Sequence, residues 1–209
     1  LSIRYYVDGL RWAGSPYAFS TIGSCIAVSV DHYCQARGFP KRSGGEDFYL
    51  LNKLAKLGKV VELTGKPVLI EARESDRAPF GTGKAVAGIL SEEVSTLFDY
   101  DPRVFLALRE LHHRFLALPD AVSPQDTADW LHRLSEPTRM ALAELGIDKF
   151  FEHIQGQHYN GHQIAKHLPL WFDGFRTLKF INHLQKYTYP AIPLAQALLA
   201  FNSLIDATH

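Results

Sequence analysis

Two adjacent acidic residues, Glu46 and Asp47, stand at the start of a strongly apolar helical pattern. Leucines recur after them at helical spacing, and Asp47 precedes Leu50, Leu51 and Leu54 by three, four and seven residues. Asp47 therefore shares the apolar face of this helix. A helix N-terminus favours an ionised carboxylate by roughly 0.3–1 kcal/mol, which keeps such an acid available as a base near neutral pH. The spacing predicts a carboxylate that could act as a general base.

The residues in front of the acids allow two interpretations. Gly44 and Gly45 lack Cβ atoms, so backbone or a ligand can approach the acids closely. Ser43 and Glu46 have the spacing of a capping box, in which Ser43 is the N-cap and Glu46 reaches back to its amide. Capping gives Glu46 a structural role but leaves Asp47 unexplained, because a cap needs only one carboxylate.

A second segment that could bind a ligand covers residues 71–84, which are dense in charge, glycine and hydroxyl groups. Loops of this composition commonly bind ligands, and Arg77 or Lys84 could pair with a phosphate. Gly81 and Thr82 belong to a glycine pair too short to identify a nucleotide-binding loop. The alternative is a plain charged connection.

The ten histidines include one pair at metal-ligand spacing. His158 and His162 are four residues apart and could face one metal ion on a helix, with His167 nearby. No glutamate lies between them as in the metalloprotease motif. Core, surface or hydrogen-bonding histidines are the alternative interpretation.

Composition excludes several classes of function. The chain has 209 residues, of which 46% are hydrophobic and 21% charged, as in an ordinary globular protein. Its 22 basic residues equal its 22 acidic residues, so no basic field indicates nucleic acid. No apolar run reaches the roughly 18–20 residues of a membrane span. Two cysteines, Cys25 and Cys34, are too few for a disulfide framework, so we expect reduced, packed thiols in a cytoplasmic protein.

The first part of the chain alternates between helical and strand patterns. Ser29 or Asp31 could cap a short helix, and Gly58 ends the helix that carries the acidic pair. The patterns predict helices over 3–13, 31–36 and 46–57, and strands over 21–28, 59–63 and 67–71.

From about residue 99 onward the chain has only helical patterns. Asp101-Pro102 and Ser123-Pro124 each place a capping residue before proline at a helix start. Further helices are predicted over 136–155, 160–186 and 192–206. The fold class is therefore α+β and mostly helical, with an α/β portion over 1–95 and an all-helical region over 96–209.

The first ninety residues resemble the C-terminal half of family 2-like, GT-A-type glycosyltransferases. The resemblance is carried by the small-residue segment 23–28, the helix 31–36, Gly38-Phe39-Pro40 and, above all, the glycine–acid–acid start at 44–50. It covers about two-fifths of the chain and implies a nucleotide-binding α/β half followed by an acceptor-binding half.

The resemblance implies roles for particular residues. Asp47 would be the catalytic base of an inverting sugar transfer, or Glu46 and Asp47 together would bind the acceptor. Gly44, Gly45 and Ser24 would lie at the substrate, as would the loop residues Arg77, Gly81, Thr82 and Lys84. Arg77 would pair with the leaving diphosphate, because a guanidinium offers fixed bidentate geometry.

The partners implied are a nucleotide sugar and a glycan or other hydroxyl acceptor. A divalent metal, Mg²⁺ or Mn²⁺, would be held mostly by an Asp-x-Asp motif upstream of residue 1. Where the family often has a histidine ligand, this chain offers Glu71, Glu74 and Asp76. The chain begins at Leu1 within a helical pattern, so we expect the parent protein to extend upstream and this part alone to transfer no sugar.

A second hypothesis assigns no catalysis to the chain. The helical region would then be a docking or oligomerisation module, the acids would only cap a helix, and the sugar site would be degenerate. Apolar residues exposed as one patch on helices 99–118 or 160–182 would favour it.

Overall fold

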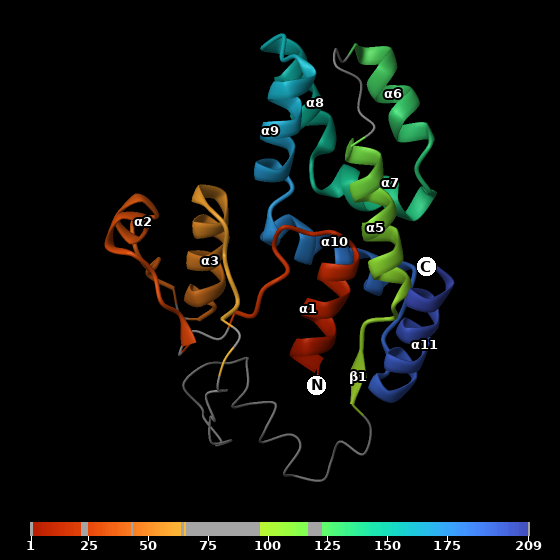
Figure 1. Cartoon of the computed structure of the whole chain (residues 1–209). Coiled ribbons are helices and arrows are strands. Elements are labelled where there is room, and N and C mark those ends of the chain that lie inside the picture. The colour runs from red at the N-terminus through yellow and green to blue at the C-terminus, as the bar shows by residue number, and fades with distance from the viewer. Residues whose placement is uncertain are drawn as a thin grey trace. The chain divides into compact units, whose positions relative to one another are not determined.

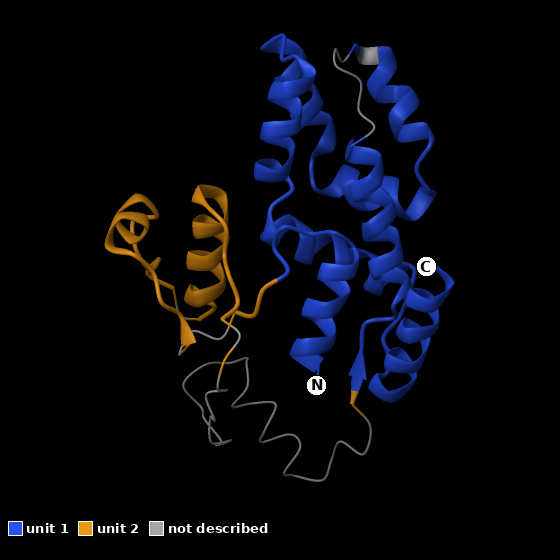
Figure 2. Ribbon diagram, viewed as in Figure 1, with its two compact units in different colours: residues 1–18, 98–209 blue, residues 19–97 orange. Residues whose placement is uncertain are grey.

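The computed structural model describes residues 2–21, 25–42, 44–63, 65, 97–116 and 123–208. Within these ranges the chain is mostly helical, as the sequence predicts (Figure 1). One two-stranded sheet pairs 98–99 with 192–193, inside the region 96–209 that was expected to be all-helical. Residues 1–18 and 98–209 form one compact unit, and residues 19–97 form the other (Figure 2). The boundary predicted at 95/96 lies near one junction, but the structure groups residues 1–18 with the helical region.

The larger unit contains most of the helices. Their bounds are α1 (Ser2–Trp12), α5 (Arg103–Leu116), α6 (Pro124–His132), α7 (Glu136–Glu144), α8 (Ile147–Gly156), α9 (Gly161–Trp171), α10 (Gly174–Tyr187) and α11 (Leu194–Ala207). The strands β1 (Phe98–Asp99) and β2 (Ile192–Pro193) pair antiparallel, with Phe98 opposite Pro193 and Asp99 opposite Ile192.

The core of this unit is built around α5 and α10, which pack against each other. Both helices place apolar residues at helical spacing, which gives each a continuous buried stripe. Full burial of each such side chain contributes about 1.5–3 kcal/mol. The fully buried members are Val104, Phe105, Leu108 and Leu111 on α5, and Phe180, Ile181 and Leu184 on α10.

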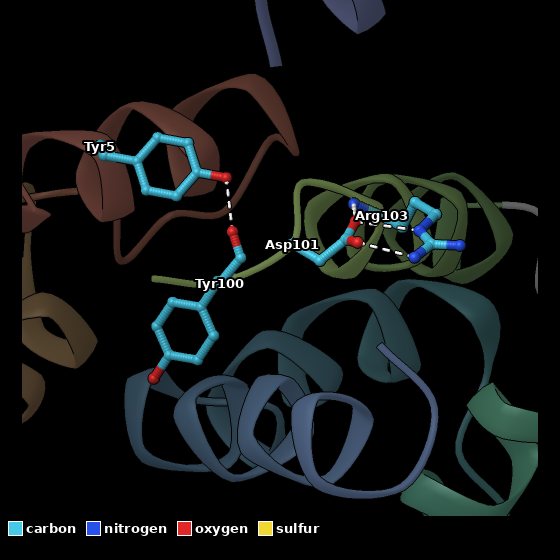
Figure 3. Close-up of polar contacts among 4 residues, drawn as sticks. All are labelled: Tyr5, Tyr100, Asp101 and Arg103. Atoms are coloured by element: carbon cyan, nitrogen blue, oxygen red, sulfur yellow. Dashed lines mark hydrogen bonds and ion pairs between the residues drawn. The ribbon is translucent and has the colours of Figure 1, made fainter. Parts of the chain in front are cut away.

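Helix α1 belongs to this core because its own buried side chains face α5 and α11. Tyr5 is 2% exposed, and its ring makes edge-on contacts with Phe105 at 5.4 Å and Phe201 at 5.7 Å. Its hydroxyl donates a 2.8 Å hydrogen bond to the carbonyl oxygen of Tyr100 (Figure 3). The hydroxyl of Ser2 also donates to the carboxylate of Asp99.

Asp101 and Ser123 bind backbone amides at helix starts, as the sequence predicts, whereas the helix predicted from residue 192 begins at Leu194, after the strand 192–193. Asp101 accepts a 2.9 Å hydrogen bond from the Arg103 amide and a two-point ion pair from its guanidinium, at 3.0 and 2.7 Å (Figure 3). Burial raises the pKa of Asp101, but the hydrogen bonds and charge of Arg103 lower it more, so it lies below its ordinary value. Ser123 forms a capping box with Asp126 on α6.

Two of the predicted helices are each divided in the structure. The helix expected over 136–155 breaks at Gly146, whose φ of 79° is left-handed, and continues as α8. The helix expected over 160–186 ends at Phe172. The side chain of Asp173 then caps a new helix by accepting from the amides of Phe175 and Arg176. The apolar periodicity of the sequence continues across both helix breaks and therefore does not predict them.

The smaller unit contains α2 (Val30–Gln35) and α3 (Glu46–Leu57), which pack together. Ser29 caps α2 by accepting from the His32 amide, so the Ser29 alternative is the correct one. Lys53 of α3 donates 3.0 Å to the carbonyl oxygen of Ala36 after α2. These contacts fix the helix that carries the acidic pair.

The strands expected in the smaller unit are not formed in its described part. Residues 25–28 contain a short 3₁₀ turn, and 59–63 are irregular, with Val61 63% and Leu63 90% exposed. Apolar β-branched residues form a buried strand only where a neighbouring strand pairs with them, and β1 pairs with β2 alone among the described residues. The strand expected over 67–71 lies outside those residues.

Candidate functional site

The acidic pair lies at the start of α3, as the sequence predicts. The N-cap position is Gly45 rather than Ser43, so the capping-box prediction is wrong in register. Gly45 adopts φ 71° and ψ 16°, a left-handed conformation that glycine tolerates best. Ser43 itself lies outside the described residues. Because Gly45 has no side chain, it cannot form a capping box with a following residue. The structural role predicted for Glu46, as the partner of a serine cap, is therefore absent.

The two acids have different surroundings although they are neighbours. Glu46 is exposed, whereas Asp47 is half-buried on the side that continues into Leu50, Leu51 and Leu54. These three leucines are at most 8% exposed. The amide of Phe48 donates 2.7 Å to Oδ1 of Asp47, which restricts the carboxylate to one orientation. An oriented carboxylate at a helix N-terminus can accept a proton from a bound hydroxyl group.

Aromatic and cationic groups stand beside the acids, and sequence reasoning missed them. The guanidinium carbon of Arg42 lies 3.9 Å from the centre of the Tyr49 ring. The ring of Phe48 meets that of Tyr49 edge-on, with centres 5.7 Å apart. In the sequence, the position of Tyr49 two residues after Asp47 was the signal that could have indicated an aromatic group near the acids. Arg42 therefore adds positive charge and a flat surface to the segment that carries the carboxylates.

The Gly38-Phe39-Pro40 turn is shaped by a close approach of Tyr33. Gly38 has φ 61°, and a Cβ atom added there would lie 2.9 Å from the Tyr33 hydroxyl oxygen. The Phe39 ring in turn packs edge-on against Tyr33, with centres 6.1 Å apart. The left-handed backbone therefore favours glycine at this turn, and any larger residue would also displace the Tyr33 side chain.

The other residues predicted at the site lie outside the described residues: Ser24, Arg77, Gly81, Thr82 and Lys84, together with Glu71, Glu74 and Asp76. Of the predicted site residues, the structure describes the four consecutive residues Gly44, Gly45, Glu46 and Asp47. Their relation to the charged loop stays a prediction.

The predicted histidine pair does not share a helix. His158 lies in the turn between α8 and α9 with φ 52°, whereas His162 is in the first turn of α9. The ring of His167 packs on Tyr159, with centres 4.8 Å apart. The described residues contain no group of three or more metal-ligating side chains. The helical i, i+4 geometry on which the metal prediction rested is therefore absent from this pair.

The two helical segments that the docking hypothesis names show little exposed apolar surface. Within the described part of 99–118, Leu116 is the only large apolar side chain that is exposed, and 160–182 has none. None of the helices in the described ranges combines the length and apolar character needed to cross a membrane.

Comparison of the chain with family models, with curated proteins and with solved structures found no match. The site is therefore interpreted from its own residues and from the motif resemblance.

Proposed function

We propose that this chain supplies the acceptor-side part of an inverting glycosyltransferase, with a GT-A-type fold in the full-length protein. The observation that carries the proposal is the start of α3. There Asp47 is half-buried, oriented by the Phe48 amide and preceded by a glycine N-cap. Because no atom lies within 4 Å of a Cβ added at Gly45, a substrate could approach the neighbouring oriented carboxylate closely.

In the proposed reaction the acceptor hydroxyl group lies against Asp47. The carboxylate accepts the hydroxyl proton while the hydroxyl oxygen forms a bond to the anomeric carbon of the donor. The bond from that carbon to the nucleoside diphosphate breaks in the same step, and the diphosphate leaves with the electron pair. Attack from the face opposite the leaving group inverts the anomeric configuration.

The neighbouring residues have supporting roles in this proposal. Glu46 is exposed one position before the base, and its carboxylate would accept hydrogen bonds from other hydroxyls of the acceptor. Arg77 would contact the leaving diphosphate through its guanidinium. A divalent metal such as Mg²⁺ or Mn²⁺, held mainly by residues upstream of this chain, would neutralise charge on the diphosphate.

We infer a cytoplasmic location for this transfer. The 209 residues contain only two cysteines, too few for a disulfide framework, and such low cysteine usage is typical of a reducing compartment.

The stereochemistry of the product tests the reaction class. The full-length protein would be incubated with a panel of uridine, guanosine and thymidine diphosphate sugars and with mixed glycan acceptors, and product would be analysed by proton NMR. We expect transfer with inverted anomeric configuration and stoichiometric release of nucleoside diphosphate. Retention of configuration, or failure to bind any nucleotide sugar, would overturn the proposal.

A further inference from the structure

The larger unit has an open pocket, about 550 Å³ in volume, at the junction of α7 and α8. The ends of α7 and α9 and the starts of α8 and α10 contribute its walls. Nine residues line it: Ala143, Glu144, Leu145, Gly146, Lys149, Phe150, His153, Trp171 and Arg176. None of these residues belongs to the smaller unit that carries the acidic pair.

One wall of the pocket is a fixed aromatic surface. The indole of Trp171 stacks on Phe150, with ring centres 5.0 Å apart and planes inclined by 29°. Phe150 is 5% exposed and belongs to the core, whereas Trp171 is half-buried and reaches the surface. Because Trp171 is half-buried, part of its indole stays accessible, and a ring already fixed by packing offers apolar contact to a ligand at low entropic cost.

Two cations stand beside this surface. The Arg176 guanidinium lies 4.9 Å from the centre of the Trp171 ring, and its Nη1 donates 2.8 Å to the Trp171 carbonyl oxygen. This anchoring uses one of five N–H donors and holds the planar group in place. Lys149 is exposed in the first turn of α8 and also lines the pocket.

The carboxylate in the pocket wall is already paired. Oε2 of Glu144 lies 2.6 Å from Nδ1 of His183, whose side chain is only 10% exposed. Gly146, the N-cap of α8, also lines the pocket, so the positive end of that helix lies at its edge. Two cations and a helix N-terminus therefore face the single carboxylate of Glu144, which is hydrogen-bonded to His183.

The geometry points to a binding site for a phosphate monoester carried on a ring. The ring would pack on Trp171, and the phosphate would contact Arg176 and Lys149. A phosphate monoester carries a charge of about −1.5 to −2 near pH 7, which matches two cations better than the single charge of a carboxylate does.

The contributions of ring and charge to binding can be separated with four probe compounds: phenyl phosphate, inorganic phosphate, phenol and benzoate. Each would be titrated into the 209-residue chain, with binding measured by calorimetry and by the NMR signal of the Trp171 indole N–H. We expect phenyl phosphate to bind most tightly, because each of the others lacks the ring, the charge or the second negative charge. Added salt should weaken the binding.

Two charge-removing variants and one matched control locate the binding. Arg176→Gln should weaken phenyl phosphate binding about tenfold, the effect of losing one charge-assisted contact. Lys149→Gln should weaken phenyl phosphate binding several-fold. Because Lys149 is exposed, this variant still tests the site if Arg176→Gln disturbs the position of Trp171. Lys179→Gln should change nothing, because Lys179 lies over the Phe175 ring at 4.7 Å and does not line the pocket.

Three results would overturn the inference. The first is absence of phenyl phosphate binding at millimolar concentration. The second is equal binding by the wild type and Lys149→Gln, which would assign the contact to another surface. The third is benzoate binding as tightly as phenyl phosphate, which would exclude a phosphate site.

Discussion

The hydroxyl group of Tyr5 donates a 2.8 Å hydrogen bond to the carbonyl oxygen of Tyr100, 95 positions further along the chain. Together with the packing of Tyr5 on Phe105 and Phe201, this bond joins α1 to the helical region. The helical unit therefore depends on the first eighteen residues. Burial, and secondarily the charges of Asp99 and Asp101, raise the pKa of Tyr5, so its hydroxyl remains a donor at neutral pH.

Tyr5→Phe removes this donor and leaves the ring packing in place. We expect the free energy of unfolding to fall by about 1–3 kcal/mol, because the Tyr100 carbonyl loses its partner. Urea denaturation monitored by circular dichroism measures the change. Tyr187→Phe is the control, since Tyr187 is 61% exposed and its substitution should cost below about 0.5 kcal/mol. Equal losses in the two variants would contradict the role given to Tyr5.

Gly9→Ala tests how closely α1 approaches α5. A Cβ atom at Gly9 would lie 2.6 Å from three ring carbons of Phe105, which is itself fully buried. Overpacking of this kind costs about 1–3 kcal/mol, and we expect a net loss of stability although alanine favours helices.

Gly156→Ala is the matched control for that substitution. It also adds a methyl group to a helical glycine, but no atom lies within 4 Å of the added Cβ. Its thermal midpoint should be equal to or above that of the wild type. If Gly9→Ala behaved in the same way, the contact between α1 and Phe105 would be wrong.

His112 makes the stability of the helical unit depend on pH. Its ring meets those of Phe115 and Phe172 edge-on, with centres 6.1 and 5.8 Å away, and its buried Nε2 has no hydrogen-bond partner among the described residues. Burial, and to a smaller extent the charge of His113, lower the pKa of His112 from 6.5 to about 4. The unfolded chain therefore binds a proton more readily than the folded one.

The direction of the pH effect follows from this difference. The contribution of neutral His112 to the free energy of unfolding is fully present above the unfolded pKa of 6.5. It is lost as the pH falls toward the folded pKa of about 4. The total loss is about 3 kcal/mol at 1.36 kcal/mol per pKa unit. His112→Leu should flatten the stability profile between these values, whereas the exposed His113→Gln should leave most of the slope. An unchanged slope in His112→Leu would contradict a buried neutral histidine.

Local signals predicted much of the helical structure. Ser29, Asp101 and Ser123 each bind backbone amides at the helix starts where their positions in the sequence placed them. Capping depends on residues within one turn, so a sequence reveals it directly. The membership of α1 in the helical unit depends instead on contacts such as Tyr5 with Tyr100, which no local pattern contains.

Local spacing also predicted one part of the candidate site. The position of Asp47 on a half-buried face follows from its spacing to Leu50 and Leu54, and the structure confirms it. The Arg42–Tyr49 contact and the Trp171–Arg176 pocket join residues through side-chain orientation, which spacing alone does not specify. The possibility that His158 and His162 share a helix face is excluded because the backbone of His158 is left-handed in a turn.

The most direct test of the central claim is the rate of sugar transfer by Asp47→Asn in the full-length protein. Asparagine keeps the shape of the side chain but cannot act as a general base. We expect the transfer rate at saturating donor to fall about 10²–10⁴-fold, with nucleotide-sugar affinity and circular dichroism unchanged. The exposed neighbour Glu46→Gln should chiefly raise KM for the acceptor. If Asp47→Asn retained most of its transfer rate, Asp47 would not be the base.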